Sequence, residues 1–421
     1  MQPTKITLKP PGQGNLSQLL SDVARPDPQP LYSDLAARGG WEMIGEGVAL
    51  CTSRRLSELV LRSPGDFSSA APIHLGNARP LLPLNVDPPD HSKYRKALEP
   101  FFSARRVAAF EPRIVSRFAG VVDTLVSSGE CDFTEEVAEV YPSAVFADLL
   151  GFAGSDVATL MAMRDGILHP ARLDASAGTD MARLHQVQER AASALYDHFT
   201  GLLEERRGGS LKSGSVKSGD VMSHLAGWQI DGVPLSDEEI LDIAFTLVIA
   251  GLDTVSDSLT CAFAFLATHP EHRDRIVGDP SLIPEAVDEL LRWESPVPTA
   301  SPRLAVRDVT LPGGISVPSG TVVLVSLAAA NVDRSACPEA LEVHLERKPN
   351  RHLAFGAGVH RCVGGHLARL EIAVAIREWH RRIPAWQLTS GFERLSYSAG
   401  LRRVDHLRLS WDAGVGDASP S

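Results

Sequence analysis

The stretch FGAGVHRCVGG, residues 355–365, decides how the rest of the chain is interpreted. Gly356 and Gly358 permit a tight turn whose backbone amides face inward, and Cys362 then stands just before a predicted helix start. Inward amides and the positive end of a helix dipole both stabilise negative charge. We therefore expect the pKa of the Cys362 thiol to be lowered, and the thiolate to serve as a metal ligand. A lone cysteine is more often a small buried apolar residue, and the spacing alone leaves both interpretations open.

The order of residues in this stretch resembles the heme-binding signature of the cytochrome P-450 family, Phe-Gly-x-Gly-x-His-x-Cys-x-Gly. Every signature position is filled, by Phe355, Gly356, Gly358, His360, Cys362 and Gly364. In that family the cysteine thiolate binds the iron of heme b (iron protoporphyrin IX) and favours cleavage of the O–O bond. The resemblance implies that Cys362 is the metal ligand and that Phe355 and Gly364 help to bind the cofactor. It extends from about residue 30 to residue 409.

A long apolar segment upstream, residues 237–269, is predicted to be a helix and contains AGLDT at Ala250 to Thr254. The Thr254 hydroxyl can bond to a carbonyl one turn earlier, and Gly251 weakens the helix. Asp253 and Thr254 permit a proton relay, although spacing alone favours a solvated polar stripe. AGLDT resembles the family's oxygen-activating motif, which implies that Ala250 and Gly251 line the oxygen pocket and that the acid–alcohol pair delivers protons. The Asp-Thr pair implies O2, and not peroxide, as the oxidant.

The resemblance also implies which groups hold the heme propionates. His91 and Arg95 are four residues apart in DPPDHSKYRK and therefore share a helix face. Arg303 and His352 complete the set. Each of these residues, taken singly, is more often an ordinary surface residue, so the assignments depend on motif position.

Glu289 and Arg292 stand three residues apart on one predicted helix. Such a pair is usually a surface ion pair worth a few tenths of a kcal/mol. Its position between the two motifs implies, by the resemblance, that it is buried, joined by Arg347, and holds the segment that presents the cysteine. The sequence departs from common family usage at Val332 and Cys337, where arginine and an aromatic residue are frequent, which bears on the packing of that segment.

The composition is that of an ordinary globular protein. The 421 residues are 44% hydrophobic and 22% charged, and a net charge of -11 argues against a nucleic-acid partner. Five cysteines without a C-x-x-C pair indicate neither a disulfide framework nor a structural zinc site. The polar N-terminal stretch is unlike a signal peptide, and no run approaches the roughly 18 apolar residues of a membrane span, so we expect a cytoplasmic protein without a membrane partner.

Apolar residues spaced three and four apart predict helices over 106–125, 181–205, 237–269, 284–293 and 364–382. Strand patterns are short: ALCT at 49–52, and 308–328, where Gly and Pro separate two strands. The expected fold class is mainly α with small β-sheets, in one large domain of the cytochrome P-450 type over 31–411. A loose arm (1–30), a flexible tail (412–421) and a Gly/Ser/Lys-rich surface loop (206–220) complete the chain.

These inferences predict a monooxygenase that inserts one oxygen atom from O2 into a hydrophobic small organic substrate, most simply by hydroxylation. Electrons would come from a separate ferredoxin or flavodoxin, because the chain has no dinucleotide fingerprint and no iron–sulfur cysteine cluster. The expected pocket is apolar, which favours a terpenoid, steroid, fatty acyl or aromatic substrate without choosing among them. Its expected lining residues are Ile73, Leu75, Met163, Ile167, Val248, Ala250 and Val297 to Ala300.

Two other classes of protein fit part of the pattern. A heme-thiolate sensor or electron carrier would not need Asp253 and Thr254, and a helical binding protein without heme would show no visible absorption spectrum. The acidic chain also carries local basic residues, which by the resemblance lie where the heme comes nearest the surface and would steer an acidic ferredoxin. They are Lys93, Lys96, Arg105, Arg106 and Arg361.

Overall fold

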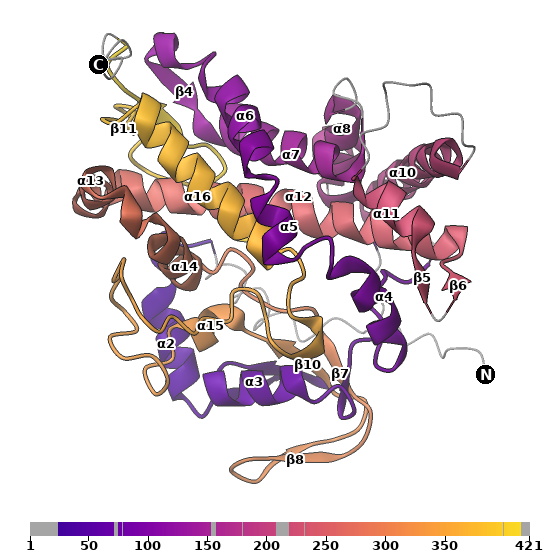
Figure 1. Cartoon of the computed structure of the whole chain (residues 1–421). Helices are drawn as coiled ribbons and strands as arrows, with labels where there is room; N and C mark the ends of the chain where they lie inside the picture. The colour runs from indigo at the N-terminus through magenta and orange to yellow at the C-terminus, as the bar shows by residue number, and fades with distance from the viewer. Residues whose placement is uncertain are drawn as a thin grey trace.

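The longest apolar segment of the sequence forms helix α12 (Asp237–Thr268), which crosses the middle of the molecule in Figure 1. The helix begins at Ser236 with a capping box: the Ser236 side chain accepts a hydrogen bond from the Glu239 N–H, and the Glu239 carboxylate accepts one from the Ser236 N–H. Nearly all residues between 240 and 266 are buried. A helix that is buried all round belongs to the core.

The computed structural model describes residues 24–70, 75–77, 79–152, 157–178, 180–207, 219–230, 232–398 and 400–413. Its other α-helices are α2 (Gln29–Ala37), α3 (Arg54–Arg62), α4 (Asp90–Leu98), α5 (Ala104–Ala108), α6 (Glu111–Val122), α7 (Val140–Leu150), α8 (Val157–Leu168), α9 (Pro170–Leu173), α10 (Met181–Arg207), α11 (Val221–Gly227), α13 (Pro270–Gly278), α14 (Ile283–Glu294), α15 (Leu327–Asn331) and α16 (Gly365–Arg382). Single turns are η1 (Val126–Ser128), η4 (Ala175–Ala177), η5 (Pro280–Leu282) and η6 (Gly358–His360), with a π-helical turn η2 (Thr134–Ala138). Helices α7, α8, α10, α11, α14 and α16 all contact α12.

The β-structure is confined to small sheets. The strands are β1 (Trp41–Gly45), β2 (Val48–Cys51), β3 (Phe67–Ser68), β4 (Glu130–Asp132), β5 (Gln229–Ile230), β6 (Val233–Pro234), β7 (Arg303–Ala305), β8 (Val309–Leu311), β9 (Ile315–Val317), β10 (Val322–Val325), β11 (Gln387–Leu388) and β12 (Arg408–Ser410). The largest sheet has the order β1-β2-β10-β7-β3. In it β10 runs parallel to β2, with Val323 opposite Ala49, and the other neighbours are antiparallel.

The segment 308–328 forms three strands where the sequence predicts two. β8 and β9 pair as a hairpin across Gly313 and Gly314, whose φ angles of 87° and 77° suit glycine. β10 follows and joins the five-stranded sheet. The extra strand was missed because arms of three residues are too short to show a clear alternation.

Two of the apolar clusters are large. The larger one surrounds α12 and includes the aromatic rings of Phe133, Phe263 and Trp379. The second lies between the five-stranded sheet and α3, and it includes Leu353 and Ala357, both from the segment that precedes Cys362. The cysteine segment is therefore anchored on the sheet before it enters α16.

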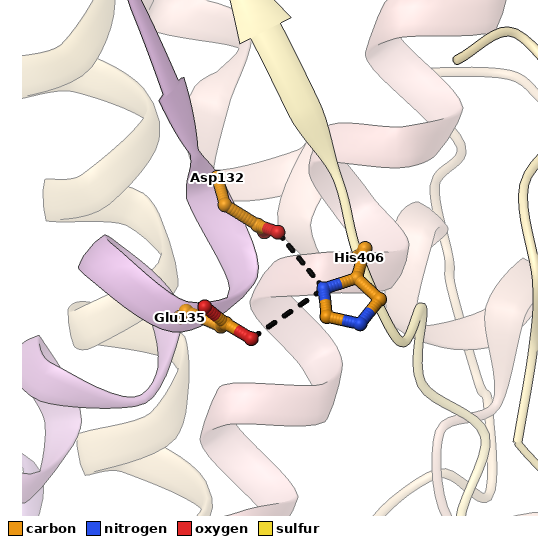
Figure 2. A group of neighbouring side chains, drawn as sticks. All are labelled: Asp132, Glu135 and His406. Atoms are coloured by element: carbon orange, nitrogen blue, oxygen red, sulfur yellow. Dashed lines mark hydrogen bonds and ion pairs between the residues drawn. The ribbon is translucent and has the colours of Figure 1, made fainter.

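A polar cluster fastens the C-terminal strand to η2. His406 Nδ1 lies 2.9 Å from Asp132 Oδ2 and 3.5 Å from Glu135 Oε1, and Figure 2 shows the three side chains converging. Asp132 is buried, and its Oδ1 also accepts hydrogen bonds from the backbone N–H groups of Thr134 and Leu407. These bonds close the three-stranded sheet β11-β12-β4.

The predicted fold class, mainly α with small β-sheets in one domain, is confirmed. The predicted arm boundary at residue 30 falls inside α2, and Arg402 donates hydrogen bonds to the carbonyls of Arg25 and Pro26. Residues 1–23 of the arm, 414–421 of the tail and 208–218 of the surface loop lie outside the described residues. Within the described part of the chain, no helix combines the length and apolarity needed to cross a membrane.

Candidate active site

Cys362 stands in a tight turn between η6 and α16. Its backbone N–H donates a 2.9 Å hydrogen bond to the Phe355 carbonyl, and Gly356 and Gly358 have φ angles of +67° and +72°. A Cβ on Gly358 would come within 2.1 Å of the Leu61 carbonyl oxygen in α3, so no larger residue fits. The two glycines thus form the predicted turn and let it approach α3 closely.

The sulfur of Cys362 lies at the start of α16. It accepts a hydrogen bond from the backbone N–H of Gly364, the N-cap residue. Although solvent reaches the residue, the surrounding protein raises the pKa of the thiol, and the Gly364 N–H and the charges of Arg95, Arg361 and Arg369 lower it only in part. The predicted lowering is therefore wrong for the protein alone, because desolvation outweighs the amide and the dipole. A bound metal cation would stabilise the thiolate further.

Basic groups from separate segments come together near this turn. The ring of His91 lies 4.3 Å from that of His360, centroid to centroid. Burial, followed by the positive charges of His91, Arg303 and Arg95, lowers the pKa of His360 to about 3. The structure therefore brings three of the four predicted propionate groups together. His360 lies in the same group. This histidine fills a position of the signature, but no contact with the cofactor was predicted for it from the sequence.

These groups fit a cofactor that carries two carboxylates. Arg303 is 4% exposed and donates only to the carbonyls of Ser301 and Pro302, with no carboxylate at ion-pair distance in the described part of the chain. The Nε2 atoms of His91 and His360 are buried and have no hydrogen-bond partner there either. Buried cations and donors are normally paired. The propionates of heme b would satisfy these groups, and its iron would satisfy the sulfur.

Two of the predicted groups already have protein partners. Arg95 Nη1 donates a 2.6 Å hydrogen bond to the Arg361 carbonyl, which places α4 beside the cysteine turn. His352 Nε2 lies 3.1 Å from Asp288 Oδ1, and its Nδ1 accepts a hydrogen bond from the Ala354 N–H. No described contact joins His352 to the His91 cluster. A contact with a propionate would require His352 to exchange Asp288 for the cofactor.

The predicted Glu289 ion-pair cluster is confirmed. Arg292 donates two 2.8 Å hydrogen bonds to the Glu289 carboxylate, and Arg347 Nε lies 3.0 and 3.1 Å from its two oxygens. The N–H of His344 and the amide of Asn350 complete its coordination. Burial alone would raise the pKa of Glu289, but these bonds lower it overall, so the carboxylate is ionised.

The two departures from common family usage are accommodated by apolar packing. Val332 is buried in a small cluster with Tyr32 and Ala329, between α2 and α15, and Cys337 packs against the same cluster. The segment that follows α15 is therefore held without the arginine and aromatic residue that are frequent in the family.

The AGLDT motif marks the place where solvent reaches the middle of α12. Of the residues from 240 to 266, only Ile249, Ala250, Gly251 and Thr254 are not buried. The Thr254 hydroxyl donates a 2.9 Å hydrogen bond to the Ala250 carbonyl, as predicted. A Cβ on Gly251 would come within 2.5 Å of the Phe146 ring in α7, so this glycine allows α7 to pack closely. Its place beside the oxygen pocket stays a prediction.

Asp253 is 3% exposed and is bound by residues that the sequence analysis did not connect with it. His169 Nε2 lies 2.6 Å from its Oδ2, and Arg164 Nε lies 3.4 Å from its Oδ1. Burial alone would raise the pKa of Asp253, but His169 and Arg164 lower it overall. Asp253 is therefore an ionised carboxylate next to Thr254.

The expected substrate residues divide into two groups. Ile167 and Val248 have no exposed surface and belong to the main core, so they cannot line a space that solvent reaches. Ile73 lies outside the described residues. Pro298 is buried as well, and the half-buried ones are Leu75, Met163, Val297, Thr299 and Ala300.

Comparisons with known proteins give the family. The family model described as Cytochrome P450 matches residues 40–279 and 281–379. "Probable cytochrome P450 127A1" of Sinorhizobium fredii is 32% identical over 87% of this chain and 84% of its own length. "Mycinamicin IV hydroxylase/epoxidase" of Micromonospora griseorubida is 34% identical over 76% of each chain. The crystal structure of CYP109E1 from Bacillus megaterium in complex with corticosterone superposes with a TM-score of 0.81 at 25% identity, covering 93% of this chain and 99% of that one. The chain therefore belongs to the cytochrome P-450 family, as an oxidoreductase with heme b that uses O2, a small-molecule substrate and a redox partner in a monooxygenase reaction.

Proposed function

We propose that this chain hydroxylates a hydrophobic small organic substrate, with Cys362 as the residue that would bind the heme iron and a ferredoxin or flavodoxin as the electron donor. The cysteine turn carries the proposal, because the Phe355 carbonyl and the Gly364 N–H fix the backbone and the sulfur of Cys362 at the start of α16. When bound, heme b supplies the iron centre that activates O2.

The surrounding residues would hold the cofactor through its edges. Arg303, His91 and His360 would pair with the propionates, since they are buried groups without acidic partners among the described residues. Arg95 would act beside them while holding the Arg361 carbonyl, and His352 would contribute only after leaving Asp288. Glu289 with its arginines would hold the segment before the turn.

Asp253 and Thr254 would move the protons that the reaction consumes. The ionised Asp253 can accept a proton, and Thr254 presents a hydroxyl where solvent reaches α12. Such positioned proton transfer contributes roughly 10²–10⁴-fold to a rate.

The substrate class is supported by the pocket and by the relatives. The expected lining residues that remain accessible are apolar or small. Mycinamicin IV and corticosterone, the compounds named for two similar proteins, are large molecules with much apolar surface. Ligand sites of this kind are mostly apolar with few placed polar groups.

Replacing Thr254 with alanine should uncouple the enzyme. Heme content and substrate binding should stay unchanged, while reducing equivalents are diverted to peroxide or water, because the hydroxyl no longer guides protons. Asp253→Asn should instead slow turnover outright, by about 10²-fold. The measurement compares product formed with reductant and O2 consumed, using a compound that shifts the heme absorption band.

Thr246→Ala is the matched control for this experiment. Thr246 lies on the same helix and makes the same bond to the carbonyl four residues earlier, at 2.8 Å, but it is buried. Its replacement should leave coupling unchanged. Equal coupling in Thr254→Ala and the parent protein would show that protons reach the site through other groups.

The expected docking surface needs correction at two residues. Lys93 is paired with Glu239, and Arg106 donates a 2.8 Å hydrogen bond to the Gly219 carbonyl while lying over the Phe101 ring. The charge of Lys93 is therefore compensated by a carboxylate, and Arg106 is half-buried and engaged within the chain. The exposed cations that remain are Lys96, Arg105 and Arg361, and we define these three residues as the docking surface.

Reversing two charges of the docking surface should slow reduction by an acidic redox partner. Lys96→Glu with Arg105→Glu is expected to lower the rate several-fold at low salt, with the difference fading as salt screens the field. Arg361 is left unchanged because its charge acts on the Cys362 thiol. Arg190→Glu, at an exposed site on α10, is the control. Equal reduction rates for the double variant and the control across a salt series would place the docking surface elsewhere.

A further inference from the structure

Three polar side chains from separate segments meet beside the cysteine turn. They are Asp288 on α14, His352 in the segment before the turn, and Arg369 on α16. Arg369 Nε donates a 2.6 Å hydrogen bond to Asp288 Oδ1, and His352 Nε2 lies 3.1 Å from the same oxygen. Arg369 Nη2 lies 3.5 Å from His352 Nε2. Asp288 thus holds both of the other side chains, and we call these three residues the Asp288 network.

The hydrogen bonds of His352 define its tautomer. The backbone N–H of Ala354 can only donate, so His352 Nδ1 accepts this bond, at 3.2 Å, and carries no proton. The ring proton is therefore on Nε2, which donates it to Asp288. The His352 side chain is 2% exposed. The neutral imidazole is a buried link between Asp288 and the backbone that leads into the cysteine turn.

Arg369 contacts the cysteine turn through an aromatic ring. Its guanidinium lies 4.3 Å from the centroid of the Phe355 ring, and its Nη1 donates a 3.2 Å hydrogen bond to the Gly365 carbonyl. The Phe355 carbonyl in turn accepts the hydrogen bond from the Cys362 N–H. The charge of Arg369 is also among those that act on the Cys362 thiol. Arg369 therefore both packs on the turn and places a positive charge near the sulfur.

We propose that the Asp288 network positions the cysteine turn and adjusts the reduction potential of the heme iron, with His352 as a positioning residue that stays on Asp288. The proposal rests on the proposed binding of the iron by Cys362. His352 fixes the backbone at Ala354, and Arg369 holds the Phe355 ring. Asp288 keeps both in place and compensates part of the Arg369 charge. Residues around a metal ligand commonly orient the ligand and alter the properties of the metal in this way.

Two single exchanges of charge test the electrostatic part of the proposal. Reduction adds one electron to the iron, so a nearby positive charge favours it and a nearby negative charge opposes it. Arg369→Gln should therefore shift the reduction potential of the heme-loaded protein to a more negative value, and Asp288→Asn to a more positive one. Both variants break the same ion pair, so a purely structural effect would shift both potentials in the same direction. Redox titration at low salt, where screening is weakest, measures the two shifts.

Arg377→Gln and Glu285→Gln are the matched controls, because they make the same changes of charge on the same two helices. Arg377 lies two turns beyond Arg369 on α16 and pairs with Glu111 at 2.9 Å. Glu285 lies one turn before Asp288 on α14 and pairs with Lys348. Neither has a recorded bond to the cysteine turn among the described residues, so both controls should keep the parent potential.

His352→Asn tests the positioning role of the histidine. Asparagine can still accept the bond from the Ala354 N–H, but it is too short to reach Asp288. Because His352 would not contact a propionate, heme should leave this variant no faster than it leaves Asp288→Asn. Transfer of the heme to an excess of apomyoglobin measures both rates.

Two results would overturn the proposal. Potentials that shift in the same direction in Arg369→Gln and Asp288→Asn, or that equal the parent value, would show that the network does not act through its charges. Faster heme loss from His352→Asn than from Asp288→Asn would show that His352 leaves Asp288 and binds the cofactor. All of these variants should keep the thiolate-type absorption band of the reduced carbon monoxide complex. Failure here is therefore distinguishable from failure of the proposed iron ligation, which that band reports.

Discussion

Replacing Cys362 with histidine is expected to abolish the thiolate-type absorption band of the reduced carbon monoxide complex and with it the monooxygenase reaction. An anionic sulfur donates electron density to the iron that a neutral imidazole cannot supply. The turn itself should persist, because the Phe355 carbonyl accepts its bond from the backbone N–H at position 362 and not from the side chain.

Cys337→Ser controls for the loss of a cysteine. Cys337 is half-buried beside α15, outside the turn, and its one recorded hydrogen bond among the described residues is a long one, 3.7 Å to the Pro338 carbonyl. This variant should keep the parent spectrum. A thiolate band that survives in Cys362→His would place the ligand at another residue.

Replacing Glu289 with glutamine is expected to destabilise the fold more than any other single exchange of a charged group considered above. Glu289 is 0% exposed and is bonded to two arginines, and its neutralisation leaves a buried Arg292 without a counter-charge. Losing one partner of a buried ion pair costs roughly 3–5 kcal/mol. We expect a lower unfolding temperature and poor heme incorporation, because Arg292 and Arg347 also donate to the carbonyls that shape the segment before the turn.

Glu285→Gln gives the matched control, one helical turn earlier on α14. Glu285 pairs with Lys348 at 2.6 Å, but the lysine is largely exposed. Exposed pairs contribute no more than about 1 kcal/mol. Thermal denaturation and the heme-to-protein ratio measure both variants, and similar values for the two would contradict a structural role for Glu289.

The pH dependence of the Glu289 contribution has a definite sign. Folding lowers the pKa of its carboxyl group. The stabilisation is therefore present above the unfolded carboxyl pKa and is lost as the pH falls through the folded value.

The parts of the site that the sequence predicted are those in which local motifs carry the geometry. The turn around Cys362 follows from glycines at fixed spacing, and the Thr254 hydrogen bond follows from its position one turn after Ala250. The Glu289 cluster followed from the family resemblance, which supplied Arg347 from a segment far along the chain.

The parts that the sequence did not predict depend on which distant segments face one another. An acid on an apolar helix needs a partner, but nothing in the pattern identifies Arg164, His169 or Arg403 as that partner. Without the cofactor the pKa of the Cys362 thiol is raised and not lowered, because desolvation by the surrounding protein, the largest influence on it, cannot be read from local sequence.

The ligation of iron by Cys362 is tested most directly by X-ray absorption at the iron edge of the heme-loaded protein. We predict one sulfur neighbour in the first coordination shell of the iron in the parent chain and in Cys337→Ser, and a nitrogen in its place in Cys362→His. A parent spectrum without a sulfur neighbour, or the same sulfur signal in Cys362→His, would contradict the account.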